Sequence, residues 1–400
     1  MREADRLRSN TDRHLRRTGY AAFIFHGACA FSSGIVVSML QERYGFAYGM
    51  TGTLLSCVSI GNMIASFVCG MLTEKIGMRR TALTLSLGHA VGYAAMAFCG
   101  LPGVLLAAFL MVGIAKGTLL NTCTVLVGNH AEDRPKAMTI MHCFAAIGAT
   151  LTPFLLAALS KFGTVPAILG VSACGGAAWI IFAAGRLPGK ETSDGETTAT
   201  ARVAEKTHID FSFLRQPQFW LLAALLFCQQ AAEQGVNGWL VTYFKDQGIL
   251  TGVLSTYTVS IMWGATLAGR LVVAFALKIR NVFRVLTVMG LGCIATYLIL
   301  MQMTAAIPAV TALFCFAFAM AGVNPLTVAA VGEDLSPASA GILLPIGGIG
   351  AIVMPYVIGI FADSVSLFIG MAMNLMPCAG ILAFSLILLM RSASKSSCEG

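Results

Sequence analysis

The sequence has little charge. Only 11% of its 400 residues are Asp, Glu, Lys or Arg, whereas 57% are hydrophobic; an ordinary soluble domain has roughly 25% charged residues. Apolar runs recur about every 30 residues, which is typical of a helical bundle in a membrane and unlike the short alternating strands of a membrane barrel. We therefore predict an all-α membrane protein, and the net charge of +8 does not indicate nucleic-acid binding because it lies in loops.

Signatures of enzymes and of metal sites are also missing. The sequence has no P-loop and no nucleophile elbow, and its loops are too small for a nucleotide-binding domain. The twelve cysteines are scattered and form no C-x-x-C or metal-ligand pair, so we expect buried thiols without disulfides. We predict no enzymatic activity, no metal and no cofactor, apart from a coupling ion, H⁺ or Na⁺.

Twelve segments are long and apolar enough to be membrane spans, each needing about 20 residues. They cover residues 19–40, 50–72, 82–101, 103–127, 137–159, 164–185, 217–244, 253–277, 283–303, 306–331, 339–362 and 366–390.

The Lys and Arg residues outside these spans lie almost entirely on one side. Twenty-one fall in the two termini and in the loops after even-numbered spans, whereas only Arg43, Lys161 and Lys245 fall on the other side. By the positive-inside rule, both termini are cytoplasmic. We expect a multi-pass protein of the plasma (inner) membrane, surrounded by lipid and working as a monomer.

A polar segment divides the chain into two halves. We assign residues 1–18 and 391–400 to cytoplasmic terminal segments, 19–185 and 217–390 to two six-helix halves, and 186–216 to a cytoplasmic central loop. An internal repeat supports this division. In the first half, Asn121 of span four precedes the sequence Gly148-Ala-Thr-Leu-Thr-Pro in span five; in the second half, Asn324 of span ten precedes Gly350-Ala-Ile-Val-Met-Pro in span eleven. Parallel repeats of this kind are typical of secondary transporters.

The seventh span carries a polar stripe in its middle. At about 100° per residue, Gln229, Glu233 and Asn237 fall within about 40° of one another, and Gln230 lies on the same arc. A carboxylate facing lipid costs a few kcal/mol at least. The stripe must face protein or water, either as part of a substrate or ion pathway or as a polar contact between helices.

The fourth span contains the other buried charge, Lys116, on one arc of the helix with Asn121. A lysine near the centre of a span reaches the lipid headgroups only with difficulty. It is a counter-charge for Glu233, an anchor for an anionic substrate, or one member of a structural ion pair.

A glycine-rich basic motif follows the second span and reads Gly70-Met-Leu-Thr-Glu-Lys-Ile-Gly-Met-Arg-Arg. It resembles the loop signature of the major facilitator superfamily, whose places are filled here by Gly70, Glu74, Lys75, Gly77, Arg79 and Arg80. The usual acid of the signature is Asp, so Glu74 departs from it. A degenerate copy, with Gly269 and Arg270, follows the eighth span. The resemblance implies twelve helices and a gate at the cytoplasmic ends of the halves, although simple anchoring would also explain Arg79 and Arg80.

The same resemblance implies that spans one, four, seven and ten line the transport cavity. Besides Lys116, Asn121 and the stripe around Glu233, this adds His26 and Ser33 from span one and Asn324 from span ten. Pro325 removes a helix hydrogen bond beside Asn324. His89 and His142 receive no role. Glu233 followed six residues later by Trp239 looks like the seventh helix of the fucose-type sugar:cation symporters.

These observations predict a secondary active transporter of a small polar solute, a sugar or a sugar-like molecule, that works by alternating access and is coupled to a proton or sodium gradient. One alternative is a symporter or exchanger of organic anions in which Lys116 binds a carboxylate. Another is a sensor that keeps the fold without transport. The direction of transport stays open.

Overall fold

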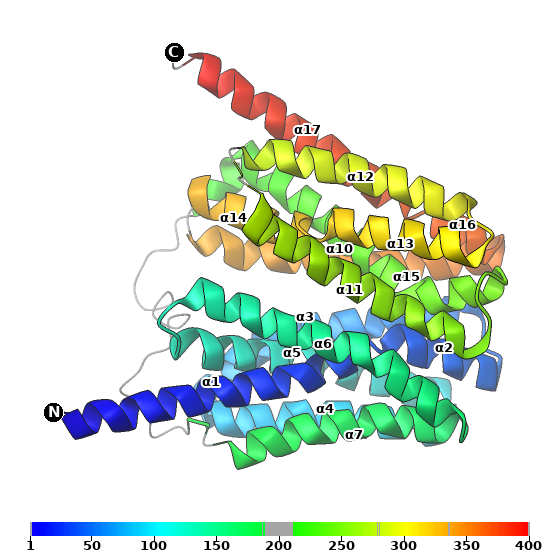
Figure 1. Cartoon of the computed structure of the whole chain (residues 1–400), viewed down its shortest axis with the longest axis horizontal. Coiled ribbons are helices and arrows are strands. Elements are labelled where there is room, and N and C mark those ends of the chain that lie inside the picture. Colours follow the sequence, from blue (N-terminus) through cyan, green and yellow to red (C-terminus); the bar gives the residue numbers. More distant parts are fainter. Residues whose placement is uncertain are drawn as a thin grey trace. The chain divides into compact units, whose positions relative to one another are not determined.

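The computed structural model describes residues 2–185, 187–188, 211–277, 279, 281–334 and 337–398, and within these ranges it contains helices and no strand (Figure 1). The chain divides into two compact units. One consists of Met1–Gly45 with Cys57–Lys206, and the other of Phe46–Ser56 with Thr207–Gly400. The short segment Phe46–Ser56 begins a helix of the predicted first half, yet it packs with the second unit.

In the first unit, α1 packs against α5, α6 and α7, and α4 packs against α5 and α7 (Figure 1). The helices are α1 (Arg2–Ala30), α2 (Ser33–Tyr44), α3 (Tyr48–Ile76), α4 (Met78–Phe98), α5 (Pro102–Asn129), α6 (Arg134–Ser160) and α7 (Thr164–Ala184).

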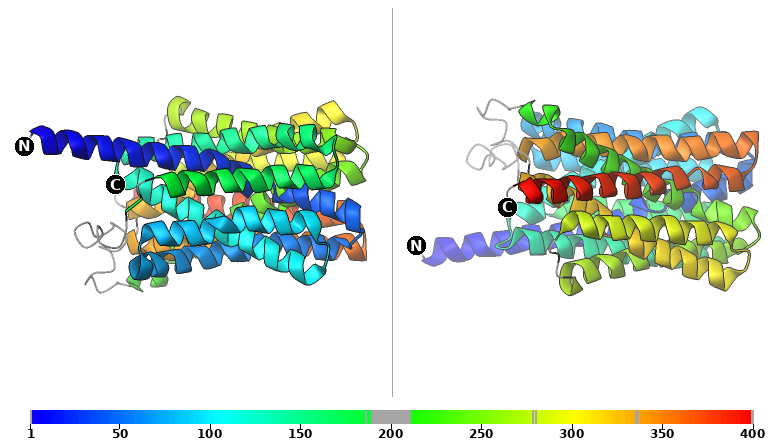
Figure 2. Two further views of the ribbon diagram at one scale, coloured as in Figure 1. Left: turned by 90° about the horizontal axis from the view of Figure 1, so that it is seen from below. Right: turned by 90° about the horizontal axis from the view of Figure 1, so that it is seen from above.

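In the second unit, α10 packs against α15 and α17, and α12 packs against α13 and α17. Figure 2 shows α17, in red, alongside α12, in yellow. The elements are η1 (Phe211–Arg215), α10 (Pro217–Asp246), η2 (Gly252–Thr256), α11 (Tyr257–Leu271), the π-helical turn η3 (Val272–Ala276), α12 (Val282–Gln302), α13 (Ala306–Met320), α14 (Val323–Asp334), α15 (Pro337–Ser364), α16 (Leu367–Ala372) and α17 (Leu375–Cys398).

The predicted spans agree with these helices to within a few residues at most ends. Among the described residues, eleven segments are long and apolar enough to cross a membrane. The remaining predicted span is the seventh, α10, which has 30 residues and is therefore long enough, but its central Gln, Glu and Asn side chains lower its hydropathy. The protein is an all-helical, multi-pass membrane protein.

Three of the predicted spans are interrupted. The first breaks at Phe31 and Ser32 between α1 and α2, the tenth at Ala321 and Gly322 between α13 and α14, and the twelfth between α16 and α17. In the tenth, Pro325 has no N–H to bond the carbonyl of Ala321. In the first, the Ser32 hydroxyl turns back to the carbonyl of Ala28, the kind of local bond that competes with the helix.

The repeated glycines of the sequence occupy equivalent packing positions in the two units. A Cβ on Gly148 of α6 would overlap the carbonyl oxygen of Ile24 on α1. A Cβ on Gly350 of α15 would overlap the carbonyl oxygen of Phe227 on α10. Spans five and eleven therefore approach spans one and seven backbone to backbone, as small residues permit in membrane bundles. These two contacts are equivalent in position, as the predicted internal repeat implies.

Side-chain caps fix several helix starts. The Asp133 side chain accepts a hydrogen bond from the Lys136 N–H at the start of α6, and Asn281 accepts one from the Arg284 N–H at the start of α12. A cap from another helix occurs at α3, where the two carboxylate oxygens of Asp363 on α15 accept the N–H groups of Tyr48 and Gly49 at 2.8 and 2.6 Å. This cap holds the beginning of α3 in the second unit, because it satisfies two N–H groups that the helix itself cannot bond.

Candidate functional site

The polar stripe of α10 is joined by hydrogen bonds inside the second unit. The Gln229 Nε2 donates to the Glu233 carboxylate one helical turn away, at 2.5 Å, and the Asn324 Nδ2 of α14 donates to the Gln229 Oε1 at 3.1 Å. Gln229 is fully buried, whereas Glu233 and Asn324 are half-buried. The stripe thus faces a neighbouring helix, and Gln229 links the carboxylate to α14.

A second polar contact lies farther along α10. The Trp263 indole N–H of α11 donates to the Asn237 Oδ1 at 3.0 Å, and both side chains are buried. On another side of α10, the Trp239 indole donates to the Pro355 carbonyl of α15 at 3.0 Å. Trp239 is therefore a packing residue between helices, whereas Trp263 orients Asn237. Gln230, also predicted here, is half-buried.

In the first unit, Lys116 of α5 lies beside the break between α1 and α2. Its ammonium is 5.4 Å from the centre of the Phe31 ring, a cation–π distance, and the side chain is half-buried. Phe31 immediately follows the carboxyl end of α1, so the Lys116 ammonium lies where the dipole of that helix favours a positive charge. Asn121, which is also half-buried, lies farther along the same helix.

The break itself is held by a tyrosine from α4. The buried Tyr93 hydroxyl donates to the Cys29 carbonyl at 2.6 Å, and the Ser33 hydroxyl lies 3.4 Å from the same tyrosine oxygen. Tyr93 thereby satisfies a carbonyl near the end of α1. Ser33, predicted to line the cavity, is buried at the start of α2.

His26 is buried in α1, and its ring stacks on the Phe23 ring with centroids 4.5 Å apart. His89 of α4 lies beside it, with a centroid distance of 6.4 Å. Sequence reasoning gave His89 no role, because a lone histidine in an apolar span carries no sign of its neighbours. A helical wheel of residues 82–101 would have placed His89 on the same side as Tyr93, four residues later.

The predicted site residues thus form two groups, one in each unit. Gln229, Glu233 and Asn324 are directly linked in the second unit, and Lys116 and His26 lie near the helix break of the first. A pairing of Lys116 with Glu233 would join the two units and stays a prediction.

The glycine-rich motif between α3 and α4 has a clear backbone role at one position. Gly77 has a φ of 86° and separates the two helices, a conformation that favours glycine. Arg79 donates to the Ala183 carbonyl at 3.4 Å, within the first unit. Glu74, Lys75 and Arg80 are exposed, and a Cβ added to Gly70 would meet open space. The gating role of this motif stays a prediction.

The second copy of the motif is more buried. A Cβ on Gly269 of α11 would come within 2.7 Å of the Phe318 carbonyl of α13. The adjacent Arg270 is half-buried, and its Nε has no hydrogen-bond partner among the described atoms. The close approach of α11 and α13 requires the glycine.

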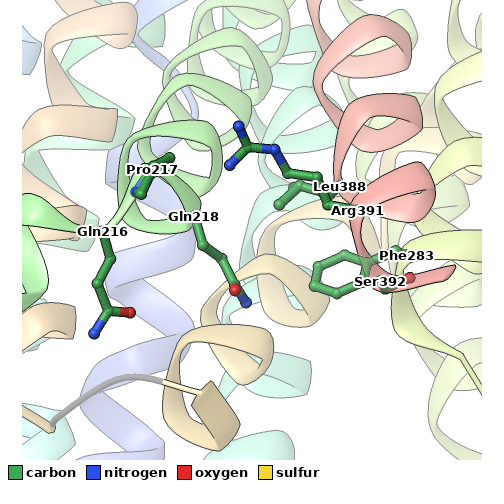
Figure 3. A pocket seen from close by; sticks show the side chains of 7 residues that line it. All are labelled: Gln216, Pro217, Gln218, Phe283, Leu388, Arg391 and Ser392. Atoms are coloured by element: carbon green, nitrogen blue, oxygen red, sulfur yellow. The ribbon is translucent and has the colours of Figure 1, made fainter. Parts of the chain in front are cut away.

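One cavity in the described part of the chain lies away from both groups. It has a volume of about 460 Å³ and is found where α10 begins and α17 ends; Figure 3 shows its lining side chains, among them Gln216, Gln218 and Arg391. It contains none of the predicted site residues. Among the described residues, no three His, Cys, Asp or Glu side chains come together as metal ligands.

Comparison with known proteins identifies the family. The model of the Major Facilitator Superfamily matches residues 19–341. The chain belongs to the major facilitator superfamily. This membership agrees with the resemblance of the glycine-rich motif and with the repeated six-span pattern.

Two proteins from other organisms align with most of this chain. The gallate transporter of Pseudomonas putida is 23% identical over 363 residues, which cover 82% of this chain and 81% of that protein. Bypass of stop codon protein 6 of Saccharomyces cerevisiae is 21% identical over 393 residues, which cover 88% and 72%. The protein is a transporter of this superfamily, and the similarity is too low to transfer a substrate.

A solved structure shares the fold. The crystal structure of the nucleoside transporter NupG superimposes with a TM-score of 0.76 at 15% identity and covers 95% of this chain and 98% of that one. At this identity the likeness establishes the fold alone.

Proposed function

We propose that the protein is a secondary active transporter that moves a small polar, sugar-like solute across the membrane by alternating access of its two halves. The observation that carries this proposal is the hydrogen-bonded set of Gln229, Glu233 and Asn324. Amide and carboxylate groups provide both donors and acceptors for the hydroxyl groups of such a solute. Placing them inside a membrane bundle is costly, which supports a functional role.

We further propose that Glu233 couples transport to a cation gradient. It is the acid of the buried stripe, and a carboxylate binds either a proton or Na⁺. When Glu233 is ionised, both of its oxygens accept hydrogen bonds, and one accepts from the Gln229 amide; when it is protonated, one oxygen becomes a donor and the carboxyl group is a weaker acceptor for that amide. Cation binding therefore changes the hydrogen bonding of Gln229, and through it that of Asn324 on α14.

The experiment is uptake by the purified protein in liposomes, with a panel of sugars, polyols and nucleosides and with an imposed pH or sodium gradient. In Glu233→Gln we expect gradient-driven accumulation to disappear while exchange of solute across the membrane continues. Glu132→Gln, an exposed site after α5, is the matched control and should behave like the wild type. Undiminished uphill uptake by Glu233→Gln would exclude the coupling role.

A second candidate is an organic-anion symporter or exchanger, favoured by Lys116 and by the name of the gallate carrier among the relatives. An ammonium inside the bundle is a natural partner for a carboxylate, whereas a neutral sugar does not need it. In this case Lys116→Met would abolish binding of gallate or benzoate, used as probes, and Lys116→Arg would retain part of it. A sugar carrier would keep solute binding in both variants.

The proposal includes an orientation, with both termini cytoplasmic and the protein in the plasma membrane. The support is the strong asymmetry of Lys and Arg between alternate loops. One variant carries a single cysteine in the loop between α6 and α7, and another carries a single cysteine in the segment just before α10, each on a cysteine-free background. A membrane-impermeant maleimide should label the first from outside and the second from the cytoplasmic side. Labelling of both from outside intact cells would contradict this orientation.

A further inference from the structure

The cavity where α10 begins belongs to neither group of candidate site residues. It has a volume of about 460 Å³, within the usual range for sites of small ligands. Its lining comes from three parts of the second unit that are far apart in the sequence: the residues that begin α10, the second residue of α12 and one face of α17. Figure 3 shows Gln216 and Gln218 on one side of the space and Phe283, Arg391 and Ser392 on the other.

The cavity lies where membrane spans begin and end. α10 begins at Pro217, the span of α12 begins at Val282, and the span that contains α17 ends at Ser392. In the first turn of α10, Trp220 is 52% exposed, and its indole N–H donates to the Leu214 carbonyl at 2.8 Å. An exposed tryptophan at the end of a span is typical of the level of the lipid headgroups. The cavity therefore lies at the surface of the bilayer.

The charge of the lining is positive. Arg391 is exposed, and no acidic side chain is among the described residues that line the cavity. A guanidinium presents a planar fork of N–H donors that fits two oxygens of a phosphate, and the amide of Gln216 is a further donor. The Ser392 hydroxyl, in contrast, donates to the Leu389 carbonyl of its own helix at 2.8 Å. The polar part of the lining thus suits an anion with several oxygens.

Two other lining residues are apolar. Leu388 is buried and precedes Arg391 by three residues, so the two lie on the same face of α17. Phe283 is half-buried at the start of α12. Near them on α17, Met390 is 63% exposed, an apolar side chain that lipid chains cover in a membrane. The cavity therefore places a phosphate-binding group beside apolar surface, which matches a molecule with a charged head and an apolar tail.

We propose that this cavity binds an anionic phospholipid, with Arg391 holding the phosphate group and with Phe283 and Leu388 contacting the adjoining apolar part of the lipid. One lipid at this place contacts three helices, and it ties the start of α10 to α12 and α17. Free inorganic phosphate offers the same oxygens to Arg391 but uses none of the apolar lining. The inference goes beyond the proposed transport function, because the site lies apart from Glu233 and needs no solute.

The first test measures lipid binding to the full-length protein. Delipidated protein in a neutral detergent is titrated with phosphatidylglycerol or with phosphatidylcholine of the same acyl chains, and bound lipid is counted by native mass spectrometry. The ionic strength is about 0.15 M, at which a charge that does not touch the lipid is largely screened. We expect a single site that prefers phosphatidylglycerol by a factor of about five or more. Equal affinity for the two lipids overturns the proposal.

Variants at exposed arginines locate the site. Arg391→Gln should lower the affinity for phosphatidylglycerol about fivefold, to the level of phosphatidylcholine, and Arg391→Lys should retain part of the preference, because it keeps the charge without the fork. Arg284→Gln is the matched control, since Arg284 is exposed and adjoins Phe283 but does not line the cavity. The same loss in Arg284→Gln and Arg391→Gln would mean that the surface charge as a whole attracts the lipid, and the cavity would be rejected as its site.

Cross-linking tests the position without any variant. A phosphatidylglycerol that carries a photoreactive diazirine near its glycerol group should attach to peptides that contain Phe283 or Leu388. Attachment confined to peptides of the first unit would contradict the proposal.

Free phosphate is distinguished in the same titration. Millimolar inorganic phosphate should leave the bound phosphatidylglycerol in place, because the ion lacks the apolar contacts. If the ion displaces the lipid from the wild type, the cavity is a site for free phosphate and the lipid proposal fails. Failure of the transport function looks different: liposomes that move no solute of the sugar or carboxylate panels would reject transport and leave these binding results unchanged.

Discussion

The two units use the same backbone contact but contain different polar chemistry. In each, a glycine of the fifth or eleventh span lies against a carbonyl of the first or seventh, at Gly148 and Gly350. Beside these contacts, the second unit holds a carboxylate joined to amides, whereas the first holds an ammonium and imidazoles beside a broken helix. The two units therefore share this packing contact, while the ionisable side chains beside it differ: a carboxylate in one unit, an ammonium and imidazoles in the other.

The largest expected effect tests the shared packing. Gly148→Val and Gly350→Val should each destabilise the protein by about 3 kcal/mol, because the new side chain would overlap a backbone carbonyl that cannot move aside. The free energy of unfolding in mixed detergent micelles is the measurement. Gly348→Val on the same helix as Gly350 has open space at its Cβ position and is the control. A large loss in one unit alone would show that the contacts are not equivalent.

A smaller effect tests the amide network of the second unit. Gln229→Leu should cost about 1–2 kcal/mol, because it leaves the Glu233 carboxylate and the Asn324 amide without their shared partner. Gln230→Leu removes the same group one residue along α10, at a half-buried position, and should cost less. Equal losses in the two variants would mean that the network contributes little to stability.

The next effect concerns the turn between α3 and α4 in the first unit. Gly77→Ala should cost about 1 kcal/mol, because an L residue is strained at a φ of 86°. Gly70→Ala lies within α3 with nothing near its Cβ position and should be neutral or slightly stabilising through helix propensity. Thermal unfolding of the two variants side by side separates the backbone requirement from any role in gating.

The smallest effect sharpens the picture of α10. Trp263→Phe keeps the ring but removes the N–H that bonds Asn237, so we expect a loss of about 0.6 kcal/mol, the average for such bonds in membranes. Trp239→Phe removes the bond to the Pro355 carbonyl and serves as a comparison. If Asn237 contacts the solute, only Trp263→Phe should also weaken solute binding, as measured by the substrate concentration for half-maximal uptake.

Much of the fold was predictable because hydropathy and length determine where a chain crosses lipid. The start of α5 at Pro102 and of α10 at Pro217 also follow from the preference of proline for the first turn of a helix. The break at Phe31 and Ser32 is followed by Ser33-Gly34, a turn signal that an apolar span of this length overrides in a hydropathy reading. Its position also depends on Tyr93 from another helix, which no local sequence signal gives. Likewise, no local signal assigns Phe46–Ser56 to the second unit, because the Asp363 that caps this segment lies about 300 residues away.

The candidate site was predictable only in part, for a similar reason. The arc from Gln229 to Asn237 follows from helical geometry, and its inward orientation follows from the cost of charge in lipid. Which neighbour meets it, Asn324 or Trp263, depends on how α11 and α14 pack. The proximity of His89 to His26 depends in the same way on how α4 and α1 pack, so the sequence alone could not predict that the two histidines are neighbours.

The polarity of α10 has a consequence for how the protein is made. During synthesis this helix leaves the ribosome before α14 and α15 exist, yet its Glu and Gln side chains find their partner Asn324 only on α14. Its entry into the bilayer therefore depends on helices made later or earlier in the chain, rather than on its own hydropathy. Among the described spans, α10 is the one whose own hydropathy is too low for crossing the membrane alone, so contacts with the neighbouring helices must keep it there.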